Sequence, residues 1–497
     1  MTTNLTTKEN SMADQTLADE NGYKPQKKAN FTSWQASNAL TQSSLAVVEP
    51  YVPIFARSIG ASAGEVGLIA GLFSLVNMSQ LIWARLSTRF GKSRIFVFVG
   101  QLVSAFLFLP MIFLRTGQVA FLLVIRILQG LFTSAAVPTQ ANLMADHISE
   151  KERATKVTAF TRIGLVGVFV GVLVGGQLFT TVSKDLGMGD QTGYTVIFVL
   201  TSVLGMLGAS LFYISVPDKQ YITKMDPFTL VRNQGEVSPS QLGLRKTILA
   251  YGQKFRNFWM FTIFGVIFYF ATFLTGPFFI ILEIEYYGFS FFQAGLLSAI
   301  STVVQISVAI LTNKLRLYDT FGRKLFLFAG TVLIFFTPIA VIIPHWFPSI
   351  PAFLWCVGVW VIIGVGWGLF NTVVAIFLLD IAHPRYRSTL IASYNTFVGL
   401  AMFMGPVVGG ILIEITGEIS TAFVLRAFVM IVGFVPLVFV KEPEITGVIL
   451  RPVRNFFPNI FKVTSHGTSV TLAQGRPMRH RNKHWISSRF KKRIKQF

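Results

Sequence analysis

The sequence predicts an all-α membrane protein with twelve helices in two similar six-helix halves, and three observations carry that prediction. The 497 residues are 52% hydrophobic and only 13% charged, whereas soluble chains carry about 25% charge. Apolar runs long enough to cross about 30 Å of hydrocarbon recur along the chain, and a pattern of acidic, basic and glycine residues occurs twice. Backbone groups in lipid must be bonded internally, so the runs are expected to be helices.

The repeated pattern links the two halves residue by residue. Its copies are Asp146, Arg153, Gly175 and Gly176 in the first half, and Asp380, Arg387, Gly409 and Gly410 in the second. Each residue lies 234 positions from its counterpart (380 − 146 and 410 − 176). A spacing shared across a helix, a loop and another helix indicates two copies of one module. Duplicated modules in so apolar a chain are typical of transport proteins with a site between the halves.

Twelve apolar spans are expected, six on each side of a polar basic linker. They run over residues 36–57, 64–86, 95–115, 118–144, 156–180, 194–216, 257–283, 290–314, 324–344, 352–379, 388–413 and 420–440. The predicted parts are an N-terminal tail (1–33), a first bundle (34–216), the linker (217–256), a second bundle (257–441) and a C-terminal tail (442–497).

The positive charge sets the predicted orientation. The formal net charge is +21, and it sits in loops and tails, which favours a membrane surface over nucleic acid as its partner. With both termini in the cytoplasm, the external loops hold only Arg57, Arg115 and Lys184. This asymmetry predicts a multi-pass protein of the plasma membrane with both ends cytoplasmic.

The end of the basic C-terminal tail has two interpretations. Residues 484–497 place apolar side chains near helical spacing among arginines and lysines. That pattern fits a short interfacial helix on anionic lipid. A disordered basic tail that serves the positive-inside rule explains the same residues.

Two basic turns and three helix motifs carry a family resemblance. The turns follow spans 2 and 8 and contain Arg89, Gly91, Arg94, Asp319, Gly322 and Arg323, with glycines free to adopt positive φ. Span 4 contains Arg126-Ile-Leu-Gln129-Gly130, span 5 contains Gly171-Val-Leu-Val-Gly175-Gly176, and span 11 contains Gly405-Pro406-Val-Val-Gly409-Gly410. Together they resemble the major facilitator superfamily over about residues 36 to 440, and its twelve-helix drug:proton antiporters in particular.

Two departures separate the chain from that antiporter pattern. Thr88 stands where the first turn of the family usually has Asp, and Ala84 where it usually has Gly. Val172 stands where span 5 of the antiporters has Pro, and the proline form appears in span 11 as Pro406. The superfamily resemblance is unaffected, whereas the antiporter resemblance is weakened.

Arg126 is the charge that most needs an explanation, because an arginine inside an apolar span requires a partner or an aqueous cavity. Glu49 in span 1 is the expected partner. Glu49 is spaced to share a helical face with Asn38 and Gln42, and Arg126 with Gln129. The resemblance implies that Glu49 carries a proton and that Arg126 tunes its release. The alternative is that Glu49 is an acid near the outer membrane face.

Two further arginines lie inside spans. Arg162, early in span 5, either lines the cytoplasmic half of a cavity or extends to the inner surface. Arg426 lies near the external end of span 12, and we expect it to extend to the surface.

The repeated loop charges are expected to form a cytoplasmic gate. Asp146 and Arg153, with Asp380 and Arg387, would form ion pairs with the basic turns and stabilise an outward-facing state. Solvated loop charge is the alternative. The glycine motifs with Pro406 allow close helix packing and, alternatively, rocking between the halves.

Substrate-binding residues are expected among aromatic and polar side chains of the spans. The chain has 49 Phe, and an aromatic cavity suits hydrophobic or amphipathic compounds. Apart from Glu49, we expect almost no buried carboxylate in the spans. The polar candidates are Asn77, Gln80, Tyr269, Gln305, Asn371, Tyr394 and Asn395.

The sequence thus predicts a monomeric secondary transporter that works by alternating access. Proton-coupled efflux of small lipophilic compounds is the first hypothesis. Uptake of an organic solute by symport is the second, and a sensor or scaffold without transport is the third. No enzyme, cofactor or metal site is expected, because phosphate-binding loops and clustered histidines are missing from the sequence, and Cys356 fits core packing.

Overall fold

The computed structural model describes residues 29–90, 92–148, 150–217, 255–315, 317, 321–382 and 387–441. Within these ranges the chain is built of helices joined by short turns, and no strand occurs. Residues 1–28 of the predicted N-terminal tail, nearly all of the linker and the whole C-terminal tail with its basic segment 484–497 lie outside the described residues. Their predicted roles therefore stay predictions.

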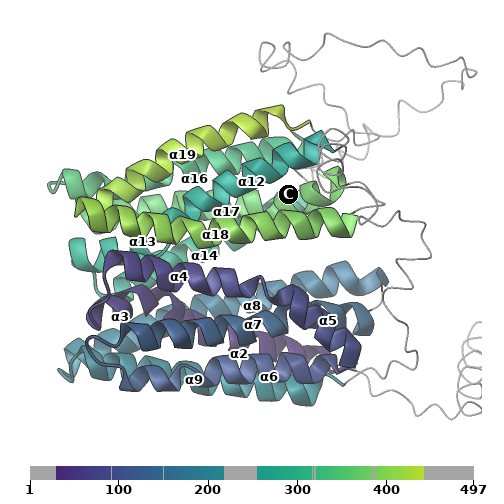
Figure 1. The fold of residues 1–497 in the computed structure, drawn as a ribbon, viewed down its shortest axis with the longest axis horizontal. Coiled ribbons are helices and arrows are strands. Elements are labelled where there is room, and N and C mark those ends of the chain that lie inside the picture. The colour runs from purple at the N-terminus through teal and green to yellow at the C-terminus, as the bar shows by residue number, and fades with distance from the viewer. Residues whose placement is uncertain are drawn as a thin grey trace, which may run out of the picture. The chain divides into compact units, whose positions relative to one another are not determined.

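The first half contains eight labelled α-helices and three short turns of other helix types (Figure 1). The α-helices are α2 (Phe31–Val48), α3 (Val52–Ser58), α4 (Ala63–Asn77), α5 (Gln80–Phe90), α6 (Ser93–Phe106), α7 (Val119–His147), α8 (Glu150–Thr180) and α9 (Asp190–Ser215). The short turns are η1 (Glu49–Tyr51), η2 (Leu109–Phe113) and η3 (Thr181–Asp185).

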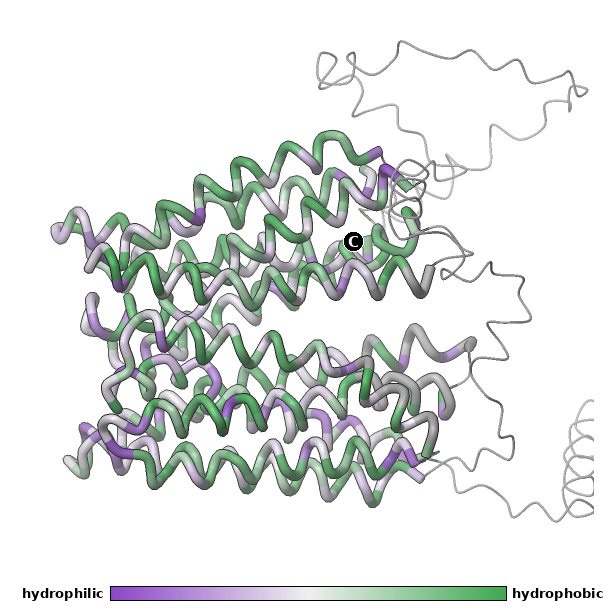
Figure 2. Tube along the Cα trace, in the orientation of Figure 1, coloured by the Kyte–Doolittle hydropathy of each residue, from purple (hydrophilic) through white to green (hydrophobic). Residues whose placement is uncertain are grey.

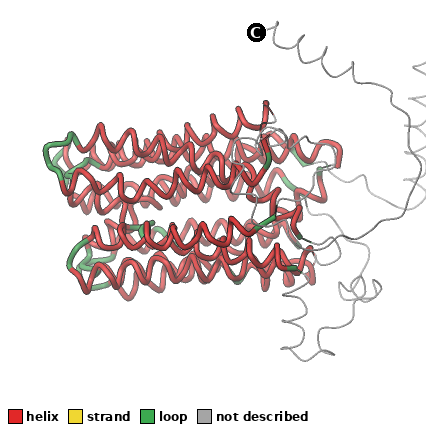
Figure 3. The backbone as a smooth tube through the Cα atoms, turned by 90° about the horizontal axis from the view of Figure 1, so that it is seen from above, coloured by secondary structure: helices red, strands yellow, loops and turns green. Residues whose placement is uncertain are grey.

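The second half repeats this order. Its helices are α12 (Arg256–Leu274), α13 (Phe278–Ile281), α14 (Phe291–Leu315), α16 (Arg323–Trp346), α17 (Ala352–Ile381), α18 (Arg387–Thr416) and α19 (Ile419–Phe439), with a π-helical turn η5 (Leu282–Tyr286) after α13. The helices of both halves run side by side with loops at their two ends (Figure 3). Apolar residues dominate along the helices (Figure 2).

All twelve predicted spans are helical, and ten described segments are long and apolar enough to cross a membrane. The other two are the first and second spans, which are interrupted. Span 1 passes from α2 through η1 into α3 where Pro50 and Pro53 stand, because proline lacks the N–H that continues a helix. Span 2 changes from α4 to α5 at Met78 and Ser79.

Glycines on α8 and α18 let helices of the same half approach closely. A Cβ on Gly171 or Gly175 would overlap a backbone carbonyl oxygen of α2. A Cβ on Gly405 or Gly409 would meet a carbonyl oxygen of α12 in the same way. These glycines therefore pack against the first helix of their own half.

The last glycine of each repeated pair packs across the halves instead. A Cβ on Gly176 would lie 2.7 Å from the carbonyl oxygen of Phe291 on α14. A Cβ on Gly410 would overlap the carbonyl oxygen of Ala63 on α4. The helix pairs α8–α14 and α4–α18 form the main contacts between the halves. In each half, the first glycine of the Gly-Gly pair thus packs within its own half, and the second packs against the other half.

One end of the molecule holds the halves together through polar contacts, and we call it the α3–α4 end. The ion pair between Arg57 and Glu285 joins α3 to η5 over 3.4 Å. The carboxylate of Glu414 on α18 accepts hydrogen bonds from Ser62 Oγ (3.0 Å) and from the Gly64 backbone N–H (2.9 Å). The charge asymmetry of the sequence predicts that this end is external.

Candidate functional site

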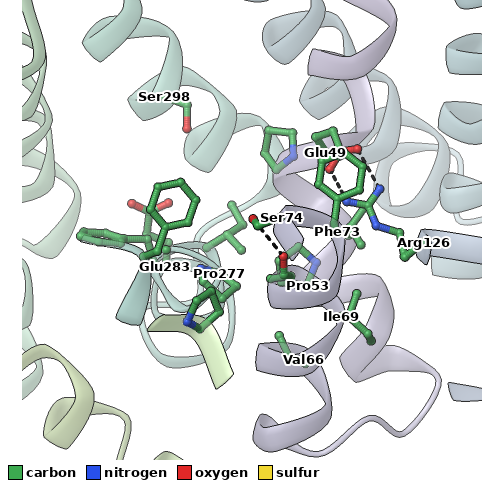
Figure 4. A pocket seen from close by; sticks show the side chains of 18 of the residues that line it. Glu49, Pro53, Val66, Ile69, Phe73, Ser74, Arg126, Pro277, Glu283 and Ser298 are labelled. Carbon is green, nitrogen blue, oxygen red and sulfur yellow. Dashed lines mark hydrogen bonds and ion pairs between the residues drawn. The ribbon is translucent and has the colours of Figure 1, made fainter. Parts of the chain in front are cut away.

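A cavity of about 280 Å³ lies between the halves, with walls from both (Figure 4). Its surface is mainly apolar and aromatic, with two carboxylates and one guanidinium. The lining residues are Glu49, Pro50, Val52, Pro53, Val66, Ile69, Ala70, Phe73, Ser74, Arg126, Phe273, Gly276, Pro277, Phe279, Ile280, Glu283, Ser298, Trp360 and Pro406.

Arg126 and Glu49 form a bidentate ion pair on one side of the cavity. Arg126 Nη1 lies 2.8 Å from Glu49 Oε1, and Nη2 lies 2.8 Å from Oε2. Nη1 also donates to Gln129 Oε1 over 2.9 Å, and the guanidinium carbon lies 4.3 Å from the ring centre of Phe73. The partner predicted for Arg126 is therefore present, in the two-bond geometry that makes such pairs strong.

The break in span 1 places Glu49 at this site. Glu49 ends α2 and begins η1, so its side chain no longer follows the helical face predicted from its spacing. Asn38 instead donates to the backbone carbonyl of Phe160 on α8 over 3.0 Å. Gln42 faces Gly164 of α8. Neither lines the cavity, so their predicted grouping with Glu49 is wrong.

Glu283 is a second carboxylate on the opposite wall (Figure 4), and it is not among the site residues predicted from the sequence. Its side chain is fully buried. The Trp360 indole N–H donates to Oε1 over 2.6 Å. Within the described part of the chain, Oε2 has no hydrogen-bond donor.

Local helix geometry explains why the sequence did not reveal Glu283. Glu283 is the last residue of the predicted span 257–283 and lies two positions before Glu285, so its place in the sequence does not distinguish it from a residue at the end of the span. The π-helical turn η5 separates their surroundings. Glu285 is partly exposed beside Arg57, whereas Glu283 is buried.

The two carboxylates bind residues that occupy the same position in the two halves. Arg126 and Trp360 are 234 residues apart (360 − 126), as are the glycines of the repeat. The carboxylates themselves are not counterparts. Ser62 and Ser290 cap α4 and α14 and are 228 residues apart (290 − 62). With this offset, the counterpart of Glu49 in the second half is Pro277 and not Glu283.

The predicted substrate residues lie elsewhere. Asn371 and Asn395 are exposed, and Tyr394 is buried against Gly265 of α12. Arg162 is exposed on α8. The side chain of Asn77 lies outside the described residues. The candidates that do not line the cavity are Gln80, Tyr269, Gln305, Asn371, Tyr394 and Asn395.

Arg426 does not extend to the surface as expected. Its side chain is only 3% exposed, and Nη1 donates to Thr275 Oγ1 over 2.7 Å. The guanidinium carbon lies 5.3 Å from the ring centre of Phe279. The kink of span 7 near Thr275 supplies this hydroxyl, which helical periodicity could not predict.

The end opposite the α3–α4 end contains part of the predicted gate. Arg323 and Asp380 form an ion pair within the second half, as expected for that turn. Gly322 has φ +94°, which glycine adopts without strain. Arg94 Nε donates to the Tyr213 backbone carbonyl over 2.8 Å. The other gate side chains, Arg89, Asp146, Arg153, Asp319 and Arg387, lie outside the described residues, and the gating role stays a prediction.

Comparison with known proteins identifies the family. The sequence model of the Major Facilitator Superfamily matches residues 36–406 and 261–486. The chain belongs to the Major Facilitator Superfamily. It is therefore a multi-pass membrane transporter, and not an enzyme.

Several relatives are efflux pumps, and each of their alignments with this chain covers only part of the two proteins. An uncharacterized MFS-type transporter of Methanocaldococcus jannaschii is 21% identical over 82% of this chain and 96% of its own. A multi-drug resistance efflux pump PmrA homolog of Lactococcus lactis is 23% identical over 32% of this chain and 39% of its own.

Solved structures share the MFS fold at low identity. The nucleoside transporter NupG aligns with a TM-score of 0.63 and 12% identity over 83% of this chain and all of its own. A POT family transporter in complex with 5-aminolevulinic acid gives 0.60 and 13%, over 82% and 94%. At these identities the likeness extends to the fold alone.

Proposed function

We propose that this MFS transporter exports small lipophilic compounds by alternating access, coupled to inward movement of protons. The observation that carries the proposal is the Glu49–Arg126 pair in the wall of an aromatic cavity between the halves. The cavity surface suits apolar compounds. The partial similarity to multi-drug efflux pumps supports the same substrate class.

Alternating access follows from where the halves touch. The contacts of Arg57, Glu285 and Glu414 hold the α3–α4 end together. If that end is external, as predicted, this structure corresponds to an inward-facing state. Opening it requires these contacts to break while the opposite ends of the halves approach one another.

The ion pair gives the proton a defined role. While the pair is closed, both carboxylate oxygens of Glu49 accept hydrogen bonds from Arg126. Glu49 is the more accessible partner, with 30% of its side chain exposed against 4% for Arg126, so water reaches the acid first when the pair opens. Protonation of Glu49 is therefore coupled to a change in the cavity wall.

Proton-driven export of ethidium from everted membrane vesicles tests the proposal. We expect wild-type vesicles to accumulate ethidium when a proton gradient is applied, and Glu49→Gln vesicles to lose that accumulation at equal protein level. Glu152→Gln is the matched control, because Glu152 is exposed on α8, does not line the cavity, and forms an ion pair with Lys156 (3.1 Å).

Three outcomes separate the hypotheses. Unchanged export by Glu49→Gln rules out this residue as the coupling group. Gradient-driven movement in the opposite direction indicates uptake. The absence of flux for all compounds of a substrate screen in a pump-deficient host favours a sensor or scaffold.

A further inference from the structure

The two joints between the halves, α8–α14 and α4–α18, are built alike. In the first joint, Thr180 Oγ1 on α8 accepts a hydrogen bond from the backbone N–H of Phe292 on α14 over 3.2 Å. In the second, Glu414 on α18 accepts one from the backbone N–H of Gly64 on α4 over 2.9 Å. The acceptors are 234 residues apart (414 − 180), and the donors are 228 apart (292 − 64). Each joint therefore caps one helix from the other half by the same design.

The α8–α14 joint contains a phenolic hydroxyl. Tyr51 of η1 is fully buried, and its Oη lies 3.2 Å from the carbonyl oxygen of Phe291 and 3.4 Å from that of Val172. Both distances exceed the roughly 2.7–2.8 Å common for hydroxyl donors, so the single hydrogen is shared between a carbonyl of each half. The counterpart of Tyr51 in the second half is Phe279 (279 − 51 = 228), which has no hydroxyl.

Two glycines, one from each half, make room for the hydroxyl. A Cβ on Gly176 of α8 would lie 2.7 Å from Tyr51 Oη, and a Cβ on Gly295 of α14 would lie 2.6 Å from it. Nonbonded atoms pack at roughly 3.5–4.0 Å, so a side chain at either position would displace the hydroxyl. We call the space between Gly176 and Gly295 the glycine notch.

The α4–α18 joint is packed more closely than the α8–α14 joint. A Cβ on Gly67 of α4 would overlap the carbonyl oxygen of Pro406 on α18. The equivalent Cβ on Gly295 would lie 3.0 Å from the carbonyl oxygen of Val172. Gly67 and Gly295 are counterparts (295 − 67 = 228), as are Val172 and Pro406 (406 − 172 = 234). One joint is therefore backbone against backbone, and the other is held apart by the Tyr51 side chain.

The hydroxyl in the notch is linked to the ion pair of the cavity through one short turn. Glu49 begins η1 and Tyr51 ends it, with Pro50 between them. Arg126 holds Glu49 by two hydrogen bonds of 2.8 Å. A rotation of η1 that separates Glu49 from Arg126 therefore also displaces the hydroxyl of Tyr51.

We propose that Tyr51 is a positioning residue that couples the Glu49–Arg126 pair to the α8–α14 joint. This inference rests on the proposed alternating-access function and concerns how its cavity opens. While the pair is closed, the hydroxyl stays in the glycine notch and bonds Phe291 of the other half. When the pair opens, η1 withdraws the hydroxyl and the halves separate along α8–α14, with the closely packed α4–α18 joint as the hinge.

Labelling of the cavity from the predicted external side measures this opening. Ser298→Cys places a thiol in the cavity wall on α14 (Figure 4), in a Cys356→Ser background that removes the single native cysteine. A membrane-impermeant maleimide is added to right-side-out and to everted vesicles. In right-side-out vesicles we expect Tyr51→Phe to label about fivefold faster, the change that one hydrogen bond of about 1 kcal/mol produces. In everted vesicles it should label no faster than the parent.

The comparison of the two vesicle orientations distinguishes a positioning role from general loosening. Faster labelling of Tyr51→Phe in both orientations indicates a looser protein and overturns the proposal, as does unchanged labelling in both. Tyr287→Phe is the matched control, because its hydroxyl donates to the Val341 carbonyl over 2.6 Å within the second half. This control should label at the parent rate, and an increase equal to that of Tyr51→Phe also overturns the proposal.

Two combined variants test the link from the ion pair to the notch. Glu49→Gln frees η1 from Arg126, so Tyr51→Phe should increase external labelling by a smaller factor in that background. Gly295→Ala drives the hydroxyl out of the notch, so Tyr51→Phe should add no further increase to it. Groups that act independently give factors that multiply, and multiplication in either combination overturns the proposed coupling.

Transport measurements separate this inference from the proposed function, because labelling needs neither a substrate nor a proton gradient. Unchanged labelling of Tyr51→Phe in a protein that exports ethidium rejects the positioning role and leaves the export function standing. The expected labelling pattern in a protein that exports nothing rejects the export function and leaves the role of Tyr51 standing.

Discussion

Each of the two walls of the cavity contains a carboxylate, and the two carboxylates differ in exposure and in hydrogen-bond partners. In the first half, Glu49 is partly exposed and held by two charged hydrogen bonds from Arg126. In the second half, Glu283 is fully buried and accepts one bond from the neutral Trp360. The first wall thus contains a compensated ion pair, and the second contains a buried acid with one oxygen that has no donor among the described residues.

The difference shows which features of a duplicated module persist. Gly175 and Gly409 contact the first helix of their own half in the same way, and Gly176 and Gly410 both cross to the other half. Arg126 and Trp360 occupy one position with unrelated chemistry. Backbone packing has been kept in both copies, whereas the side chains in the cavity have diverged.

Stability measurements on the two carboxylates give the largest expected effect. Glu49→Gln leaves the buried Arg126 charge uncompensated, which costs up to about 3–5 kcal/mol for a buried pair. Glu283→Gln keeps the shape of the side chain and the oxygen that accepts from Trp360, and should cost less than about 1 kcal/mol. Thermal unfolding of the two purified variants in the same detergent compares them.

The proposed difference between the two walls is contradicted if Glu283→Gln lowers the unfolding temperature more than Glu49→Gln does. Equal losses would mean that the contacts of the two carboxylates stabilise the protein to the same extent.

Alanine substitutions in the repeated glycine pair should have intermediate effects that differ in kind. Gly409→Ala drives a methyl group into the Leu274 carbonyl oxygen within the second half, and overpacking of this kind costs about 1–3 kcal/mol. Gly410→Ala meets Ala63 of the other half, so a small separation of the halves relieves it.

Unfolding and labelling together distinguish the two glycines. We expect Gly409→Ala to lower the unfolding temperature, and Gly410→Ala to increase cysteine labelling at the α3–α4 end with less loss of stability. Gly175→Ala and Gly176→Ala should reproduce the same contrast in the first half. Identical behaviour of both members of a pair would contradict the division of roles.

The smallest effect is expected at the α3–α4 end. Glu414→Gln removes the negative charge that accepts bonds from Ser62 and Gly64 at the start of α4. A carboxylate at a helix N-terminus contributes about 0.3–1 kcal/mol. Opening of this end should therefore increase by several-fold or less, measured by labelling of an engineered external cysteine. If labelling increases more in Glu414→Gln than in Gly410→Ala, the contacts of Glu414 contribute more to closing this end than their exposure indicates.

The scaffold could be predicted because its signals, apolar runs and a repeated spacing, can be recognised in the sequence without knowing which residues are in contact. Apolar runs define the spans, and the shared 234-residue spacing defines the halves. The partner of Arg126 was predictable because few acids lie within the spans. The packing glycines were predictable because they recur at helical spacing.

The rest of the site depends on helix breaks that periodicity does not reveal. Glu49 lies where α2 ends and pairs with α7, whereas Asn38 bonds α8, and Glu283 is buried on the π-helical turn that also holds the exposed Glu285. Arg426 was wrongly expected at the surface because its partner, Thr275, lies at a break in another span. Polar spacing alone cannot tell a residue that faces the cavity from one that bonds a neighbouring helix.

The buried thiol of Cys356 makes solvent access to α17, the helix that carries Trp360, measurable in the native protein. Cys356 is the single cysteine of the chain, is fully buried, and lies about one helical turn before Trp360 on α17. Thiol reagents react with a thiolate that water can reach. The rate at which a small reagent adds one mass increment per molecule therefore reports how often solvent reaches this part of α17, without any introduced label.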